Sequence, residues 1–190
     1  MSDTQQTEYL QTPSQTIGPF YGFALPFPGG PEVVPPTAEG AIRFHGDVLD
    51  GEGGAVFDSL IEIWGANPDG SPATGRGARV RAHHEFSGFG RTSADPEGHY
   101  SFTTLKPGAH REGSAPYLFV TVFARGLLTH LFTRAYFGDE AELNANDPLL
   151  SSLPEDRRKT LIAEPDGAGG YRFDIRLQGP DETVFLEYPA

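Results

Sequence analysis

The feature that most constrains the fold is a segment of strict alternation near the C-terminus. Apolar and polar residues alternate without error across residues 171–178. The apolar positions are Tyr171, Phe173, Ile175 and Leu177, and the polar positions are Arg172, Asp174, Arg176 and Gln178. A period of two residues is typical of a β-strand with one buried face. The sequence therefore predicts a sheet whose inner face receives these apolar side chains.

Short segments of strand character recur along the chain, and turns rich in glycine and proline separate them. The predicted strands are residues 41–50, 56–66, 99–105, 117–124, 129–137, 159–164, 171–178 and 183–188. Residues 117–124 and 129–137 are apolar on both faces, which predicts a place at the centre of a sheet or against another chain. Residues 71–91 are rich in Gly, Arg and His without a clear period, which predicts a long surface excursion.

Helix signals are few. Residues 139–146 are the best helix candidate, because acidic residues begin the segment and Pro148 follows it. Residues 149–156 could form one more helical turn. The pattern predicts a mostly β fold, a single-domain β-sandwich with one or two short helices and an extended N-terminal arm. Residues 1–40 are expected to form the arm and its loop, and residues 41–190 the sandwich.

Composition limits the classes of function. The formal net charge of −12 argues against a nucleic acid or an anionic membrane as partner, because both require a basic surface. The lack of cysteine excludes disulfides, thiolate nucleophiles and cysteine-ligated metal centres. The N-terminal residues lack the pattern of a signal peptide, and no apolar run approaches the ~20 residues that span a bilayer. A cytoplasmic location is therefore expected.

The arm contains a segment that can hold one shape without being a helix or a strand. Residues 12–20 read Thr-Pro-Ser-Gln-Thr-Ile-Gly-Pro-Phe, in which prolines fix φ and hydroxyl groups can bond nearby backbone. Large apolar side chains are dense between Phe20 and Phe27, more than a free tail carries in water. The arm is therefore expected to dock, either on the body of this chain or in a pocket shared with another subunit.

One side chain stands out as a candidate for chemistry. Arg134 lies within the apolar segment 129–137, where a guanidinium needs an anion or a carbonyl as partner. It either pairs with a carboxylate of this chain or presents its fork to a ligand or a partner's carboxylate. The adjacent His83 and His84 would point to opposite sides of an extended chain. The other histidines, His45, His99, His110 and His130, have no ligand spacing, so the residues alone define no convincing catalytic set.

Several blocks, in the same order along nearly the whole chain, resemble the intradiol ring-cleaving dioxygenases, and in particular their alpha-type chains. The blocks are residues 12–20, 60–64, 90–92, 104–108, 123–126, 133–141 and 171–185. The resemblance implies a β-sandwich that takes part in the opening of an aromatic ring with O2 at a non-haem Fe(III). It also implies a small aromatic carboxylate, protocatechuate, as the substrate and 3-carboxy-cis,cis-muconate as the product.

The resemblance further implies how iron is distributed between chains. In the iron-bearing beta chains of the family, two tyrosinates and two histidines hold the ferric ion, for which anionic oxygen is a suitable ligand. The corresponding positions in this chain are Pro72, His110, Tyr117 and Phe119, and only His110 and Tyr117 could bind a metal. The resemblance therefore implies that this chain has no metal site of the family type, and that a partner beta subunit holds the Fe(III).

What remains for this chain, on the same resemblance, is the wall of the substrate pocket. Thr16, Gly18 and Pro19 would line the pocket, and Arg134 would place a positive charge near the substrate. Phe20 stands where the family often has a tyrosine, so a hydroxyl contact is lost there. The chain would then be the iron-free alpha subunit of a hetero-oligomer.

Two alternatives stay open. The first is a homomeric intradiol enzyme with a shifted ligand set, which would use His110, Tyr117 and residues of the 71–91 loop. The second is a β-sandwich interaction module with no enzymatic role. A carrier or interaction module would be favoured if no iron-bearing partner accompanied the chain.

Overall fold

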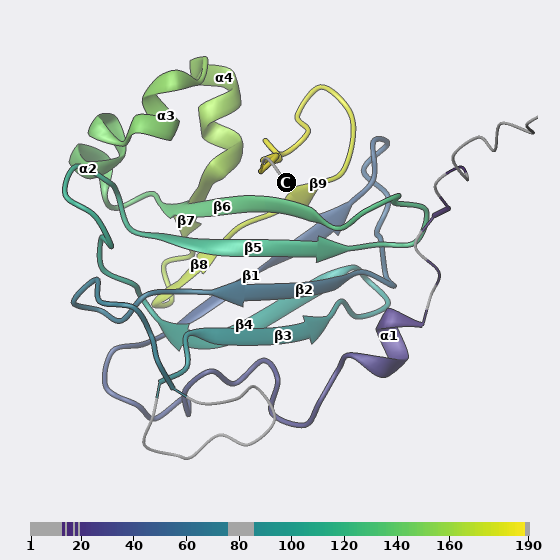
Figure 1. Ribbon diagram of the computed structural model, residues 1–190, viewed down its shortest axis with the longest axis horizontal. Coiled ribbons are helices and arrows are strands. Elements are labelled where there is room, and N and C mark those ends of the chain that lie inside the picture. The colour runs from purple at the N-terminus through teal and green to yellow at the C-terminus, as the bar shows by residue number, and fades with distance from the viewer. Residues whose placement is uncertain (1–12, 14, 17, 19, 76–85, 189–190) are drawn as a thin grey trace, which may run out of the picture.

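A strongly curled sheet forms the body of the protein (Figure 1), as seen in a computed structural model that describes residues 13, 15, 16, 18, 20–75 and 86–188. Its strands within these ranges are β1 (Ala41–Leu49), β2 (Leu60–Trp64), β3 (Phe89–Ser93), β4 (His99–Leu105), β5 (Tyr117–Phe123), β6 (Leu131–Phe137), β7 (Ile162–Pro165), β8 (Gly170–Arg172) and β9 (Ile175–Arg176). The strand order is β3-β2-β5-β6-β7-β8-β1-β4, and β9 pairs with β1. The helices are α1 (Tyr21–Ala24), α2 (Ala141–Asn146), α3 (Pro148–Ser152) and α4 (Glu155–Arg158), followed by a 3-10 turn at Lys159–Leu161.

The curl brings the two halves of the sheet together as a sandwich. Figure 1 shows β3, β2, β5 and β6 in front, with β1 behind them and the helices α2 to α4 gathered at one edge. The side chains between the halves form one apolar core, in which Phe44 of β1, Ile61 of β2 and Val120 of β5 are completely buried. Burial of this apolar area is the main favourable contribution to folding. The predicted mostly β sandwich is confirmed.

The alternating segment has the burial pattern that its sequence predicts. Tyr171, Phe173 and Ile175 are buried, and Arg172 is exposed. The strand is nevertheless split into β8 and β9, because the backbone N–H of Asp47 donates to the side chain of Asp174 (3.0 Å) instead of a backbone carbonyl. The backbone of Gly46 lies so close to that of Phe173 that a Cβ at Gly46 would be 1.9 Å from the carbonyl oxygen of Phe173.

Three local predictions differ from the structure. Strand β3 begins at Phe89, inside the range predicted as an excursion, of which residues 76–85 lie outside the described residues. Residues 183–188 do not form the predicted strand but a single β-bridge, between Leu186 and Phe132. The backbone C=O and N–H of Val184 bond instead to the hydroxyls of Thr133 and Thr160. There are also more short helices than predicted. None of the helices in the described ranges has the length and apolar character needed to cross a bilayer.

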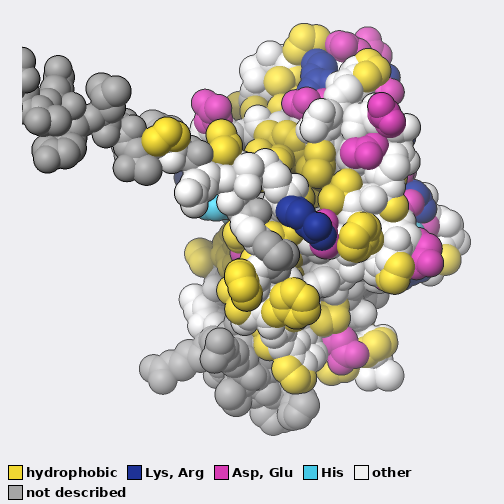
Figure 2. Space-filling model, turned by 90° about the vertical axis from the view of Figure 1, so that its right-hand side faces the viewer, with side chains coloured by type: hydrophobic (Ala, Val, Ile, Leu, Met, Phe, Trp, Pro, Cys, Tyr) yellow, Lys and Arg dark blue, Asp and Glu magenta, His cyan; other side chains and the backbone are white. Residues whose placement is uncertain are grey.

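The described part of the arm packs on the body of this chain. The Tyr21 hydroxyl donates to the carbonyl of Asp58 (2.7 Å), and its ring stacks on Phe123 at 6.2 Å. Phe20 and Phe23, on either side of Tyr21, are 80% and 84% exposed. Figure 2 views the molecule from the side on which α1 lies, and apolar side chains are visible at the surface there. Tyr21 therefore packs on the body of this chain, while the neighbouring rings of Phe20 and Phe23 stay uncovered.

Arg91 is the side chain that ties the arm to the sheet. From β3 its guanidinium binds the carboxylate of Glu62 on β2 (Nε to Oε1, 2.7 Å) and donates to the carbonyl of Leu25 (2.8 Å). It also lies 5.3 Å from the centre of the Phe89 ring, within the range of a cation–π contact. The arginine and glutamate side chains are only 20% and 17% exposed, so water screens this pair weakly.

We expect Arg91→Ala to lower the free energy of unfolding by roughly 2 kcal/mol, because it leaves the carboxylate of Glu62 partly buried without its cation. The matched control is Arg125→Ala, whose side chain is 58% exposed beside Asp58 and whose loss should cost under about 1 kcal/mol. Urea unfolding of the two variants measures the difference. Equal losses would contradict the structural role of Arg91.

Candidate functional site

The candidate site is built on the outer face of β5 and β6, around Arg134. The two strands are antiparallel, and their register places Arg134 opposite Phe119 and Tyr136 opposite Tyr117. Directly paired residues share one face of a sheet, so these four side chains lie together on the side away from the core. The guanidinium carbon of Arg134 lies 4.3 Å from the centre of the Tyr117 ring, a close cation–π contact.

A chain of hydrogen bonds leads from Arg134 to a buried carboxylate. Arg134 Nη1 donates to the hydroxyl of Tyr136 (3.3 Å), and that hydroxyl donates to Oδ1 of Asp147 (3.1 Å). Asp147 is 1% exposed and caps α3, where it accepts hydrogen bonds from the backbone of Leu149 and Leu150. Its Oδ2 accepts a further bond from the N–H of Ala115 (3.0 Å).

The electrostatic state of the cluster follows from burial and from these bonds. Burial alone would lower the pKa of Arg134, but the interactions with Tyr136, Tyr117 and Tyr188 raise it, so the side chain stays a cation. Burial raises the pKa of Tyr136 despite the nearby guanidinium, so the phenol keeps its proton. The Nε atom of Arg134 is buried and has no acceptor among the described residues. The described residues therefore leave one N–H group of the Arg134 cation without a hydrogen-bond acceptor.

The four positions that the resemblance assigns to iron ligands fall in different surroundings. His110 and Tyr117 are neighbours, with ring centres 5.2 Å apart and ring planes nearly perpendicular. Phe119 packs on Phe132, with ring centres 5.2 Å apart. Pro72 lies in the turn after β2, where its carbonyl accepts a bond from an Asn67 amide (3.2 Å).

The donors at these positions do not fit a ferric ion. Burial raises the pKa of Tyr117, which disfavours the tyrosinate form that ferric iron requires. Burial and the charges of Arg111 and Arg134 lower the pKa of His110, so a cation here would face existing positive charge. Within the described ranges no group of three or more His, Asp or Glu side chains is arranged to hold a metal ion.

The pocket-lining residues expected from the arm are only partly visible in the structure. Thr16 and Gly18 are exposed, and a Cβ at Gly18 would have no neighbour within 4 Å. Pro19 lies outside the described residues. The contribution of these three residues to a pocket therefore stays a prediction.

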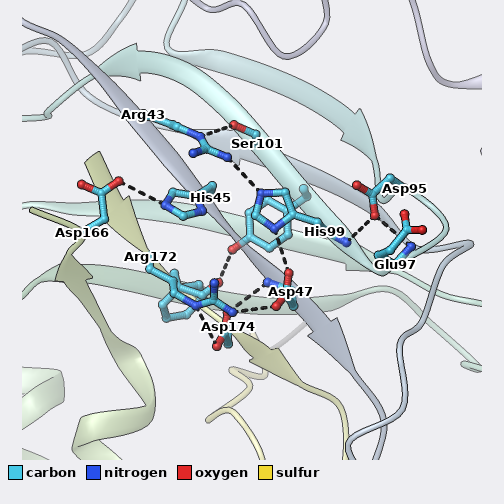
Figure 3. Close-up of polar contacts among 12 residues, drawn as sticks. Arg43, His45, Asp47, Asp95, Glu97, His99, Ser101, Asp166, Arg172 and Asp174 are labelled. Atoms are coloured by element: carbon cyan, nitrogen blue, oxygen red, sulfur yellow. Dashed lines mark hydrogen bonds and ion pairs between the residues drawn. The ribbon is translucent and has the colours of Figure 1, made fainter. Parts of the chain in front are cut away.

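A second polar cluster lies on the outer face of β1 and β4, on the other half of the sandwich (Figure 3). His99 bonds Asp47 through Nδ1 (2.8 Å) and Arg43 through Nε2 (3.1 Å). His45 bonds Asp166 through Nε2 (3.2 Å), and its ring lies 5.3 Å from that of His99. Both rings are thus hydrogen-bonded to carboxylates of this chain, which agrees with their interpretation as structural histidines.

Three blocks that carry the family resemblance meet at Lys106. Its ammonium group binds the carboxylates of Asp139 (2.9 Å) and Glu140 (2.6 Å). The hydroxyl of Tyr171 donates to the same Asp139 carboxylate (2.8 Å). Burial alone would raise the pKa of Asp139, but the bonds from Lys106 and Tyr171 lower it. This cluster fixes the turn after β6 to the end of β4.

The structure adds three residues to the site that the sequence did not indicate: Tyr136, Asp147 and Tyr188. Tyr136 could have been found, because it lies two residues after Arg134 and therefore on the same face of the strand. Asp147 precedes Pro148, which is a signal for a helix start. That signal predicts the cap on α3 but not the bond to a tyrosine on β6. No pattern in the sequence indicates that Tyr188 approaches Arg134.

Comparisons with known proteins identify the fold and the family. The dioxygenase domain of a carbohydrate-binding fusion protein from Streptomyces sp. SirexAA-E has the same fold, with a TM-score of 0.59, 23% identity, and coverage of 88% of this chain and 98% of that chain. A model of the family described as Dioxygenase matches residues 36–179.

Sequence relatives narrow the assignment. The alpha chain of protocatechuate 3,4-dioxygenase from Burkholderia cepacia is 41% identical over 95% of this chain and 99% of its own length. The beta chain of protocatechuate 3,4-dioxygenase from the same organism is 36% identical over 73% of this chain and 64% of its own length. The protein belongs to the intradiol dioxygenase family, and it is a subunit of an oxidoreductase of that class.

The Lys106 cluster predicts a pH dependence of stability. The pKa of Asp139 is lower in the folded protein than in the unfolded chain. The ionised carboxylate therefore stabilises the fold at pH values above the unfolded pKa of about 4, and this stabilisation is lost as the pH falls through the folded pKa. We expect Asp139→Asn to reduce stability by roughly 1 kcal/mol at pH 7 and to narrow the gap to the unaltered protein at pH 3. Thermal unfolding from pH 7 to pH 3 measures this, and a gap that stays constant with pH would contradict it.

Proposed function

We propose that this chain is an alpha-type subunit of a protocatechuate 3,4-dioxygenase, and that it completes the substrate pocket of an iron-bearing beta subunit. The Fe(III) belongs to the partner and supplies the chemistry of O2-dependent ring opening. This chain contributes the fixed positive charge of Arg134 and the pocket wall formed by the arm residues Thr16, Gly18 and Pro19.

The observation that carries the proposal is that no carboxylate of the described residues contacts Arg134 directly. The chain has 26 acidic residues, and Arg91, Arg125 and Arg172 each form a direct ion pair with one of them. Arg134 forms no direct ion pair within the described ranges, and its Nε atom has no acceptor there. A charge on an apolar sheet face is costly unless an anion completes it. The carboxylate of an aromatic substrate is such an anion, and arginine suits it through paired hydrogen bonds.

Support for the alpha assignment comes from the surroundings of Tyr117. Its ring is covered by the guanidinium of Arg134, and burial raises its pKa. The raised pKa opposes a tyrosinate, and the positive charge of Arg134 opposes a ferric ion beside the ring, which argues against the homomeric enzyme built on His110 and Tyr117. The extent of the match to the alpha chain, 95% of this chain against 73% for the beta chain, supports the same assignment.

Support for a partner subunit comes from apolar surface outside the core. The outer face of β5 and β6 carries the aromatic side chains Phe119, Phe123 and Phe132, and α1 exposes Phe20 and Phe23. Interfaces of obligate complexes are large and rich in aromatic residues. We infer that the beta subunit covers part of this surface, and that α1 and the face around Arg134 belong to one interface.

A test of the iron assignment is to purify the chain alone and together with its beta partner. We expect the chain alone to bind no stoichiometric Fe(III), to show no tyrosinate-to-iron charge-transfer band, and to lack activity. The complex should have all three properties. Metal analysis and visible absorption measure the difference. Iron-dependent ring cleavage by the chain alone would refute the division of roles.

A test of the Arg134 role is Arg134→Gln within the complex. We expect the preference for protocatechuate over catechol, as a ratio of kcat/KM values, to fall about a hundredfold, because only protocatechuate has the carboxylate. Iron content should stay unchanged. Lys159→Gln, which removes a charge from a side chain that is 66% exposed, is the matched control and should leave the ratio unchanged. An unaltered ratio in Arg134→Gln would reduce Arg134 to a structural residue.

A further inference from the structure

We propose that Tyr136, supported by Asp147, is a positioning residue that fixes Arg134 for the carboxylate of the aromatic substrate. The inference rests on the proposed function, since it assumes that Arg134 faces that carboxylate. Recognition of the carboxylate then depends on three residues of this chain, Arg134, Tyr136 and Asp147, and not on Arg134 alone.

The hydrogen bonds between the three side chains can run in only one direction. A guanidinium has donors only, so the hydroxyl oxygen of Tyr136 must accept the bond from Arg134. The single hydroxyl proton of Tyr136 is then available to the carboxylate of Asp147, which accepts it at 3.1 Å. Each bond polarises the next, because a cation lies at one end and an anion at the other. The rotation of the tyrosine hydroxyl is thereby fixed.

Asp147 is a rigid end point for this chain of bonds. Its Oδ1 also accepts from the N–H groups of Leu149 (2.9 Å) and Leu150 (3.1 Å), and its Oδ2 accepts from that of Ala115 (3.0 Å). The carboxylate is therefore held by the first turn of α3 and by the segment before β5. Because it is almost completely buried, it also needs a compensating positive charge. Arg134 supplies that charge through Tyr136.

Three tyrosines, Tyr117, Tyr136 and Tyr188, restrict the position of Arg134. Tyr136 binds Nη1, and the ring of Tyr117 covers one face at 4.3 Å. Nε has no acceptor among the described residues. An arginine with several free rotamers would lose more conformational entropy on binding a carboxylate than one that is already held. Tyr136 therefore improves recognition by preorganisation, without touching the substrate.

Packing is the competing explanation for Tyr136. Its ring is completely buried in a second apolar cluster with Ala115, Leu150 of α3 and Leu161 of the 3-10 turn. If packing were its only role, removal of the hydroxyl would affect stability but not the choice of substrate. A phenylalanine keeps the ring and loses only the hydrogen bonds, so the two roles can be separated.

The experiment compares Tyr136→Phe with a matched control in the assembled αβ complex. Tyr171→Phe is the control, because its hydroxyl also donates to an aspartate, Asp139, beside a cation, Lys106, but does not touch Arg134. We expect Tyr136→Phe to lower the ratio of kcat/KM for protocatechuate to that for catechol about tenfold, with iron content unchanged. Tyr171→Phe should leave the ratio unchanged even if it lowers the melting temperature. Asp147→Asn, a second variant that keeps the side-chain shape, should lower the ratio in the same direction.

A double-mutant cycle with Arg134→Gln decides whether Tyr136 acts through the arginine. In the Arg134→Gln background, Tyr136→Phe should cause no further loss of discrimination, because coupled residues are not additive. The inference is overturned if Tyr136→Phe keeps the ratio, if its effect adds fully to that of Arg134→Gln, or if Tyr171→Phe lowers the ratio equally. A normal ratio in Arg134→Gln alone overturns the role of Arg134 in the proposed function, which distinguishes that failure from a failure of the role of Tyr136.

Discussion

The apolar character of β5 and β6 on both faces is the constraint from which the rest of the structure follows. On the inner face, Val120 and Ala135 are completely buried in the core. On the outer face, Phe119 and Phe132 pack together at 5.2 Å. Arg134 is partly buried on this face, so its guanidinium depends on neighbouring side chains for part of its hydrogen bonding. Arg134 requires Tyr136, Tyr136 requires Asp147, and Asp147 fixes the start of α3.

Much of the fold could be predicted because alternation reports burial directly. Phe173 and Ile175 are buried as their positions indicate, although the strand is interrupted between them. β3 was missed because its inner position is Gly90, which has no side chain to mark a buried face. A Cβ there would lie 2.8 Å from Val33 and 2.9 Å from Phe102, so the packed core accepts only glycine. Hydrophobic periodicity cannot reveal a buried position that only glycine can occupy, because no apolar side chain marks it.

The site was predictable in part, for the same physical reason. Arg134 could be recognised from sequence because a charge in an apolar strand is conspicuous wherever the strand lies. The partner of Arg134 could not, because both proposed alternatives assumed an anion in direct contact. The structure instead interposes the neutral hydroxyl of Tyr136 between Arg134 and Asp147. Such a bond depends on where α3 begins relative to β6, which is a tertiary feature that no local pattern encodes.

The two clusters of cation, tyrosine and aspartate in this protein differ in how directly the cation contacts a carboxylate. Lys106 contacts the carboxylates of Asp139 and Glu140 directly, so its charge is satisfied within the chain. Arg134 reaches Asp147 only through Tyr136, so its charge is oriented but not neutralised by contact. Coulomb attraction weakens with distance, and a directly paired arginine would have little left to offer an incoming anion. Placing a hydroxyl between the two charges keeps the buried aspartate compensated and still leaves the guanidinium able to bind a carboxylate.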